Sequence, residues 1–265
     1  MLLRNRNISL LIFELETLWS KALTYVMLVT LIPLTLSYYD SSILFDSCEI
    51  CVISSRFTEI WHAFSGSTVI YTVFLVAATA ISWSNAINGK LAKNILSLPI
   101  SRRVFFASKI ISIVIPPYLA YIASHLFSQI YLDNFINFHS ILITVLLTAL
   151  YTLYVVSLTT LIFLIVKNSI ATVLLAISIL FLPLAGSVPS EFKYALASNY
   201  YKAALNYVHY SYCASAFNNP LLVREYLRKA NLALSELHTS LIIFTSVTLF
   251  SLIVSYIYFK KIDLD

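Results

Sequence analysis

The residue types that usually carry chemistry are sparse in this sequence and do not fall into catalytic spacings. The chain has five His, three Cys and three Gly among 265 residues. A phosphate-binding P-loop needs two Gly five positions apart followed by Lys, and no two glycines here have that spacing. A dinucleotide-binding fingerprint fails for the same reason. The histidines form no H-E-x-x-H pattern either, so we expect no catalytic residue on this chain.

The cysteines are candidates for a cross-link or a metal site. Cys48 and Cys51 have C-x2-C spacing, and His209 and Cys213 have H-x3-C spacing, which together would supply four zinc ligands. A disulfide in an oxidising exterior and free or buried thiols are the alternatives. We assign no metal to this set, because two loops far apart in the sequence would have to meet.

The composition indicates that most of the chain is solvated by lipid. Hydrophobic residues make up 60% and charged residues 11%, against about 25% charged in an ordinary soluble domain. The mean hydropathy is +0.86. These values exclude a soluble enzyme, a disordered protein and a fibrous repeat. We expect an all-α, polytopic membrane protein made of one transmembrane domain over residues 1–265.

Six segments are long and apolar enough to span a bilayer, which takes about 20 residues. An interfacial amphipathic helix (1–21) precedes them, a cytoplasmic loop (84–103) joins the second span to the third, and an outward-facing helical segment (189–238) precedes the last span. Only three residues separate the fourth span from the fifth, which predicts a tight hairpin. The expected spans are residues 22–39, 64–83, 110–132, 138–166, 170–188 and 239–259.

Basic residues predict the orientation of these spans. Eleven of the 17 Lys and Arg residues lie on the side that holds both termini, together with four of the 12 acids. Basic residues stay on the cytoplasmic side, so we expect a multi-pass protein of the cell membrane with both termini in the cytoplasm. The positive charge suits anionic lipid headgroups as partners. Nucleic acid is not expected as a partner, because the cations are dispersed over short loops that flank the membrane.

The loop between the second and third spans is amphipathic. Leu91, Ile95 and Leu98 have helical spacing, with Lys and Asn largely around them. Pro99 ends this short helix, and Ser101 is the expected N-cap of the next one. Such a helix can meet a partner protein or can merely anchor the loop in the membrane interface.

The same stretch, NGKLAKNILSLPISRRVFFASK, resembles the cytoplasmic loop of type-2 ABC-transporter permeases, the exporter-like class. Asn88 and Lys90 stand where that family often has an acid and a Thr. The six-span layout, the leading amphipathic helix and the tight fourth-to-fifth turn also resemble the family. The matching positions are Gly89, Leu91, Ile95, Leu96, Ser97, Leu98, Pro99, Ile100, Ser101, Arg102 and Lys109.

The resemblance implies a permease subunit that pairs with a second permease chain and receives two ATPase subunits from the cytoplasm. The 88–99 loop would be the coupling helix that docks in the ATPase. ATP and Mg²⁺ would bind to the partner, so no cofactor is expected on this chain. The residues implied in coupling are Gly89, Leu91, Ile95, Leu96, Ser97, Leu98, Pro99, Arg102 and Arg103.

Hydroxyl side chains line one face of the second and fourth spans. They are either a weakly polar path for an amphiphilic substrate or interhelical packing, and we favour packing because Ser and Thr readily satisfy their own backbone. No acid or Lys lies inside any of the six spans. His125 is the titratable side chain well inside a span, and it lies either on the path or in a hydrogen bond to a neighbouring helix. The candidate path residues are Thr68, Thr72, Thr79, His125, Thr144, Thr148 and Tyr151.

Three other functions are alternatives to a permease. An ion-coupled secondary carrier usually needs intramembrane acids and repeats with broken helices, and neither is evident. An intramembrane enzyme needs a metal cluster or a nucleophile with its base. A non-transporting membrane scaffold is disfavoured only by the match in the coupling loop.

Non-reducing mass spectrometry of the purified chain distinguishes the states open to Cys48, Cys51 and Cys213. Because three is an odd number, we expect at least one of these thiols to be alkylated without reduction or to link two chains. A disulfide gives one cross-linked peptide pair. Full alkylation before reduction indicates thiols, and alkylation that requires a chelator indicates zinc.

Overall fold

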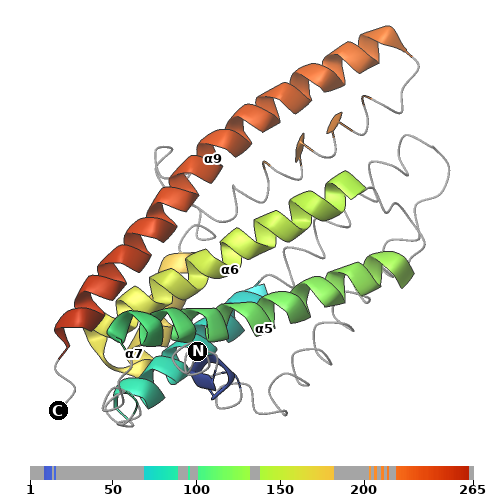
Figure 1. The fold of residues 1–265 in the computed structure, drawn as a ribbon. Coiled ribbons are helices and arrows are strands. Elements are labelled where there is room, and N and C mark those ends of the chain that lie inside the picture. The colour runs from blue at the N-terminus through green and yellow to red at the C-terminus, as the bar shows by residue number, and fades with distance from the viewer. Residues whose placement is uncertain are drawn as a thin grey trace.

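The computed structural model describes residues 9–13, 15, 69–88, 95, 101–131, 138–181, 203, 206–207, 210–211, 214 and 219–262. Throughout these residues the regular structure is helical, which confirms the all-α class for the described part of the chain. The main helices are Val69–Ile87, α5 (Arg102–Tyr131), α6 (Phe138–Val166), α7 (Ser169–Phe181) and α9 (Pro220–Lys261) (Figure 1).

Four of these helices are long and apolar enough to cross a membrane, and they correspond to the second, third, fourth and sixth expected spans. Helix α6 has the same bounds as the expected fourth span, 138–166, and its candidate membrane span is Val145–Val166. The fifth corresponds to α7, which is described over 13 residues. The first span, 22–39, and nearly all of the 1–21 helix lie outside the described residues. Six spans therefore stay a prediction.

Helix α9 is longer than the sequence pattern predicts. It runs for 42 residues from Pro220, whereas hydropathy places the last span at 239–259. Asn219 is the N-cap and accepts a hydrogen bond from the Leu221 backbone N–H at 3.0 Å. After Pro220 in the first turn, no Gly or Pro interrupts the helix. At about 1.5 Å per residue the helix is about 63 Å long, twice the ~30 Å hydrocarbon core. Part of α9 must therefore project beyond the hydrocarbon.

The amino-terminal turns of α9 are suited to water. They carry Arg224, Glu225, Arg228 and Lys229. The Lys229 ammonium lies 2.7 Å from the Glu225 carboxylate, and this hydrogen bond lowers the pKa of the carboxyl and raises the pKa of the ammonium. Both side chains are exposed, so the pair contributes little to stability. These turns form the projecting part of the helix.

Helices that follow one another along the described chain alternate in direction. Tyr71 stacks on Tyr121 while Trp83 contacts Phe106, so the Val69–Ile87 helix is antiparallel to α5. Tyr71 also bonds Thr152 while Trp83 bonds Thr160, so the same helix is parallel to α6. One end of the bundle, called the loop end here, therefore holds Ile87, the start of α5, the α6–α7 turn and the end of α9.

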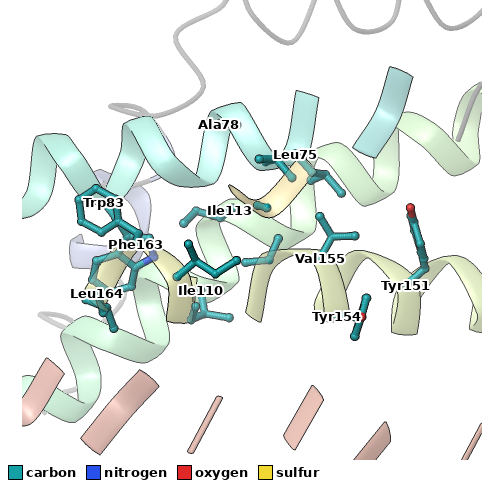
Figure 2. Packing of buried hydrophobic residues seen from close by; sticks show 14 of the residues in the cluster. Leu75, Ala78, Trp83, Ile110, Ile113, Tyr151, Tyr154, Val155, Phe163 and Leu164 are labelled. Carbon is teal, nitrogen blue, oxygen red and sulfur yellow. The ribbon is translucent and has the colours of Figure 1, made fainter. Parts of the chain in front are cut away.

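Helix α6 is the centre of the bundle and contacts α5, α7 and α9. Its sequence is strongly apolar, as expected for a central helix, although Leu146 and Ile165 remain more than half exposed. Figure 2 shows Val155 and Phe163 of α6 among Leu75, Ile110 and Ile113 from the two preceding helices. The buried hydrophobic side chains of α6 are Leu147, Tyr151, Tyr154, Val155, Val156, Ile162, Phe163 and Leu164.

Helix α9 buries one face and exposes the other. The buried face repeats at intervals of three and four residues and is rich in Ala, Ser and Thr, which allow close approach to α6. Tyr154 of α6 packs on Phe244 with ring centroids 4.1 Å apart. The opposite face exposes large apolar side chains such as Ile242 and Phe250, which suits lipid. The buried residues are Ala230, Ala233, Leu237, Ser240, Phe244, Thr248, Ser251, Ser255 and Phe259.

The turn between α6 and α7 confirms the predicted tight hairpin. Lys167 has a φ of 56°, in the left-handed region, and its N–H donates to the Phe163 carbonyl at 2.7 Å. Asn168 then starts α7, since its Oδ1 accepts from the Ala171 N–H at 3.1 Å. Two residues therefore reverse the chain.

Substitutions at Lys167 should follow the cost of the left-handed conformation. A non-Gly residue there costs about 1–2 kcal/mol, so Lys167→Gly should raise the thermal midpoint in detergent slightly and Lys167→Val should lower it. Lys167→Asn is the matched control, because it removes the same charge but tolerates positive φ. A valine variant as stable as the asparagine variant would contradict the role of the turn.

Candidate functional site

The two flanks of the predicted coupling loop lie together at the loop end of the bundle. On one side the Asn88 N–H donates to the Ser84 carbonyl at 2.8 Å, at the end of the Val69–Ile87 helix. On the other side Ser101 Oγ accepts from the Val104 N–H at 3.3 Å, which confirms Ser101 as the N-cap of α5. The coupling residues Gly89, Leu91, Leu96, Ser97, Leu98 and Pro99 lie outside the described residues.

Ile95 is the described residue within this loop. Its backbone is helical and its side chain is 8% exposed. It belongs to the main hydrophobic core of the chain. Ile95 therefore anchors the loop on the bundle, and its side chain faces its own chain.

An aromatic cluster of Trp83, Phe105, Phe106, Tyr256 and Phe259 joins three helices beside these flanks. The Trp83 ring lies 5.6 Å from Phe106 and 5.6 Å from Phe259, measured between centroids. Phe105 and Phe106 lie 5.8 and 5.7 Å from Phe259. Phe106 meets Tyr256 edge-on at 5.6 Å. Each such pair stabilises by about 0.5–1.5 kcal/mol beyond burial, so the cluster holds the three helix ends together.

A hydrogen bond extends this cluster to α6. Trp83 Nε1 donates to Thr160 Oγ1 at 3.0 Å, and both residues are fully buried. An indole N–H has no acceptor in hydrocarbon, so this bond fixes the orientation of the ring. Four helices are thereby connected at the point where the loop leaves the bundle.

Arg102 and Arg103 are adjacent in the sequence but have different hydrogen-bond partners. Arg102 Nη1 donates to the Lys260 carbonyl at 2.7 Å and to the Ile262 carbonyl at 3.0 Å. It therefore satisfies carbonyls that the end of α9 leaves without a helical partner. Arg103 Nε donates to the Tyr256 hydroxyl at 3.2 Å. Sequence reasoning missed this link between α5 and α9, because the partners are more than 150 positions apart.

Lys109 directly precedes the expected third span, 110–132, and lies inside helix α5. The Ser101 cap starts α5 eight residues before the expected boundary at 110, so Lys109 falls within a helix of membrane length. Its side chain is 2% exposed. Ser112 Oγ donates to its backbone carbonyl at 2.8 Å. A cation is therefore buried one to two turns beyond the start of α5.

The predicted hydroxyl face does bring two helices together. Tyr71 and Thr152 share a hydrogen bond of 2.7 Å between their hydroxyls, and Thr72 bonds Tyr151. All four side chains are buried. Thr152 also donates to the Thr148 carbonyl at 2.7 Å. These hydroxyls bond one another and the backbone, as the packing interpretation predicts.

The other path candidates add little to this interface. Thr79 donates to the Leu75 carbonyl of its own helix at 2.6 Å. Thr148 is fully buried, and its hydroxyl has no hydrogen-bond partner among the described residues. Thr68 lies outside the described residues, as do the side chains of Thr144 and His125.

The predicted cysteine sites cannot be placed. Cys48, Cys51 and Cys213 all lie outside the described residues. Within the residues that are described, no group of three or more His, Cys, Asp or Glu side chains could hold a metal ion.

The fold and site define a helical protein with four described helices of membrane length. A comparison with models of known protein families found no match, and a comparison with curated proteins found none either.

Truncation of Trp83 should show how far the bundle depends on the aromatic cluster. Trp83→Ala removes the ring contacts to Phe106 and Phe259 and a hydrogen bond, and should lower the free energy of unfolding by about 3 kcal/mol in a mixed-micelle titration followed by circular dichroism. Trp83→Phe keeps a ring and should cost about 1 kcal/mol. Ile242→Ala is the control, because that side chain is 65% exposed. An equal loss from Ile242→Ala would exclude a special role for the cluster.

Proposed function

We propose that this chain is the membrane-spanning permease subunit of an ATP-driven transporter of the type-2 ABC class, and that it acts in export. The proposal rests on the sequence and the position of the loop at residues 88–99. It has the family-like NGKLAKNILSLP sequence and joins two helices whose ends pack against each other through Trp83 and Phe106. A short loop held at both flanks is suited to receive a push from a partner.

The aromatic cluster gives such a push a route into the bundle. Movement of the loop acts directly on Trp83 at one flank and on Phe105 and Phe106 at the other. Phe259 touches all three rings, so α9 would move with them. Arg102 adds a second link, through its hydrogen bonds to the end of α9. The proposed coupling residues therefore lie beside contacts that connect the second, third and last spans.

The remaining components belong to partners. A second permease chain, identical or different, would complete the translocation path, and two ATPase subunits would bind ATP and Mg²⁺. ATP binding must favour one permease conformation over the other by several kcal/mol to reverse the equilibrium between them. Shifting the ratio of the two conformations from 1:99 to 99:1 takes about 5.5 kcal/mol. This chain would adopt the two conformations, and ATP binding to the ATPase would determine which of them is favoured.

The proposed orientation places the loop end in the cytoplasm of the cell. Arg102, Arg103, Lys167, Lys260 and Lys261 belong to this end of the described bundle. The projecting part of α9 at the opposite end carries acids as well as cations. The excess of basic residues on the loop side supports a cytoplasmic loop.

Leu96→Asp tests the proposed docking role. A carboxylate in the middle of the loop should prevent an ATPase subunit from seating an apolar helix, and should reduce the ATPase that co-purifies with the tagged chain at least tenfold. Leu221→Asp is the matched control, because Leu221 is 78% exposed near the opposite end of α9. The measurement is the amount of P-loop ATPase, identified by mass spectrometry, together with the ATP hydrolysis of the complex.

The outcomes separate the candidate functions. Retention of the ATPase by Leu96→Asp would refute docking through the loop. If the wild-type chain purifies with no ATPase and transports in liposomes without ATP, it is an ion-coupled carrier. A chain with neither partner nor transport is a scaffold.

A further inference from the structure

We propose that the junction of α5 and α9 binds the phosphate headgroup of an anionic phospholipid. The junction is defined here as Arg102 and Arg103 at the start of α5 and Lys260 and Lys261 at the end of α9. The Arg102–Lys260 hydrogen bond of 2.7 Å brings the two pairs together from positions 158 apart in the sequence. Figure 1 shows α5 and α9 diverging from this end toward the other.

Of the four cations, one links α5 to α9 through hydrogen bonds and three are exposed. Arg102 is half-buried and donates to two α9 carbonyls. Arg103, Lys260 and Lys261 are exposed. Arg103 uses Nε to donate to Tyr256, which orients the guanidinium and leaves its two terminal amino groups outside this hydrogen bond. A guanidinium and two ammonium groups in one place are suited to a phosphate.

The charge at this junction is not cancelled by acids in the described part of the chain. The described ion pair, between Lys229 and Glu225, lies near the opposite end of α9. Asp263 and Asp265 follow α9 in the sequence, outside the described residues. Four cations against these two carboxylates still leave the junction segments positive.

Apolar surface next to the junction favours a lipid over a free phosphate ion. Ile253 and Ile257 on α9 are 59% and 47% exposed, one to two turns from the lysines, and Ile111 on α5 is 39% exposed. Tyr258 is 47% exposed between them and the lysines, at the level where aromatic side chains meet headgroups. A phospholipid matches both the cations and the apolar surface, because its phosphate can lie at the cations and its acyl chains along the isoleucines. Basic pockets between membrane helices commonly bind such headgroups.

Native mass spectrometry of the purified full-length chain tests the site. The chain in zwitterionic detergent is titrated with phosphatidylglycerol and with phosphatidylcholine. We expect phosphatidylglycerol to be retained at least tenfold more than phosphatidylcholine. The triple variant Arg103→Gln, Lys260→Gln, Lys261→Gln should lose this preference, and the double variant of the two lysines, which keeps the Arg103–Tyr256 bond, should lose most of it.

The matched control removes the same charge from the other end of α9. Arg224→Gln, Arg228→Gln, Lys229→Gln should keep the preference for phosphatidylglycerol. Equal losses in both triple variants would overturn the proposal, because they would indicate general attraction by net charge. A wild-type chain that shows no preference would also overturn it, as would one from which millimolar inorganic phosphate displaces the lipid, since the site would then recognise a free anion. The experiment needs no ATPase, so its result is independent of the proposed transport function.

Discussion

Hydrocarbon solvates an apolar helix as well as another helix does, so this bundle depends on contacts that acyl chains cannot supply. The Val69–Ile87 helix has such contacts with α6 near both of its ends. Tyr71 and Thr72 bond hydroxyls of α6 near one end, and the Trp83 indole bonds Thr160 near the other. Two separated hydrogen-bonded points fix both the rotation and the register of one helix on the other. Apolar packing alone would leave the helix free to slide or rotate against lipid at little cost.

The same constraint applies at the loop end, where side-chain contacts connect four of the described helices. Rings at Trp83, Phe106 and Phe259 fill the space where three helix ends would otherwise leave gaps for lipid or water. The end of α9 presents carbonyls without helical partners, and Arg102 satisfies two of them. A loop that emerges from such a point transmits displacement to several helices, whereas a loop on a frayed end would absorb it.

Much of this architecture follows from the sequence, because hydropathy and charge report directly on the lipid boundary. The bounds of α6 agree with the pattern, since it is apolar throughout and ends at a two-residue turn. The start of α9 does not agree with the hydropathy pattern, because its charged first turns resemble a solvated segment. The local signal was Asn219–Pro220, a helix-starting pair. Partnerships such as Arg102 with Lys260 depend on tertiary packing, which no local pattern encodes.

The length of α9 has a consequence for how its two ends can move. It is one uninterrupted helix from the turns that project at Arg224 to the junction at Lys260. A helix with no Pro, Gly or break after its first turn bends only gently, so a displacement at the aromatic cluster would tilt or translate the projecting turns as well. The small side chains along its buried face, such as Ser251 and Ser255, present few obstacles to sliding on α6. The coupling proposed above would therefore need no relay of side chains through the bundle, because a single helix links the loop end to the projecting turns.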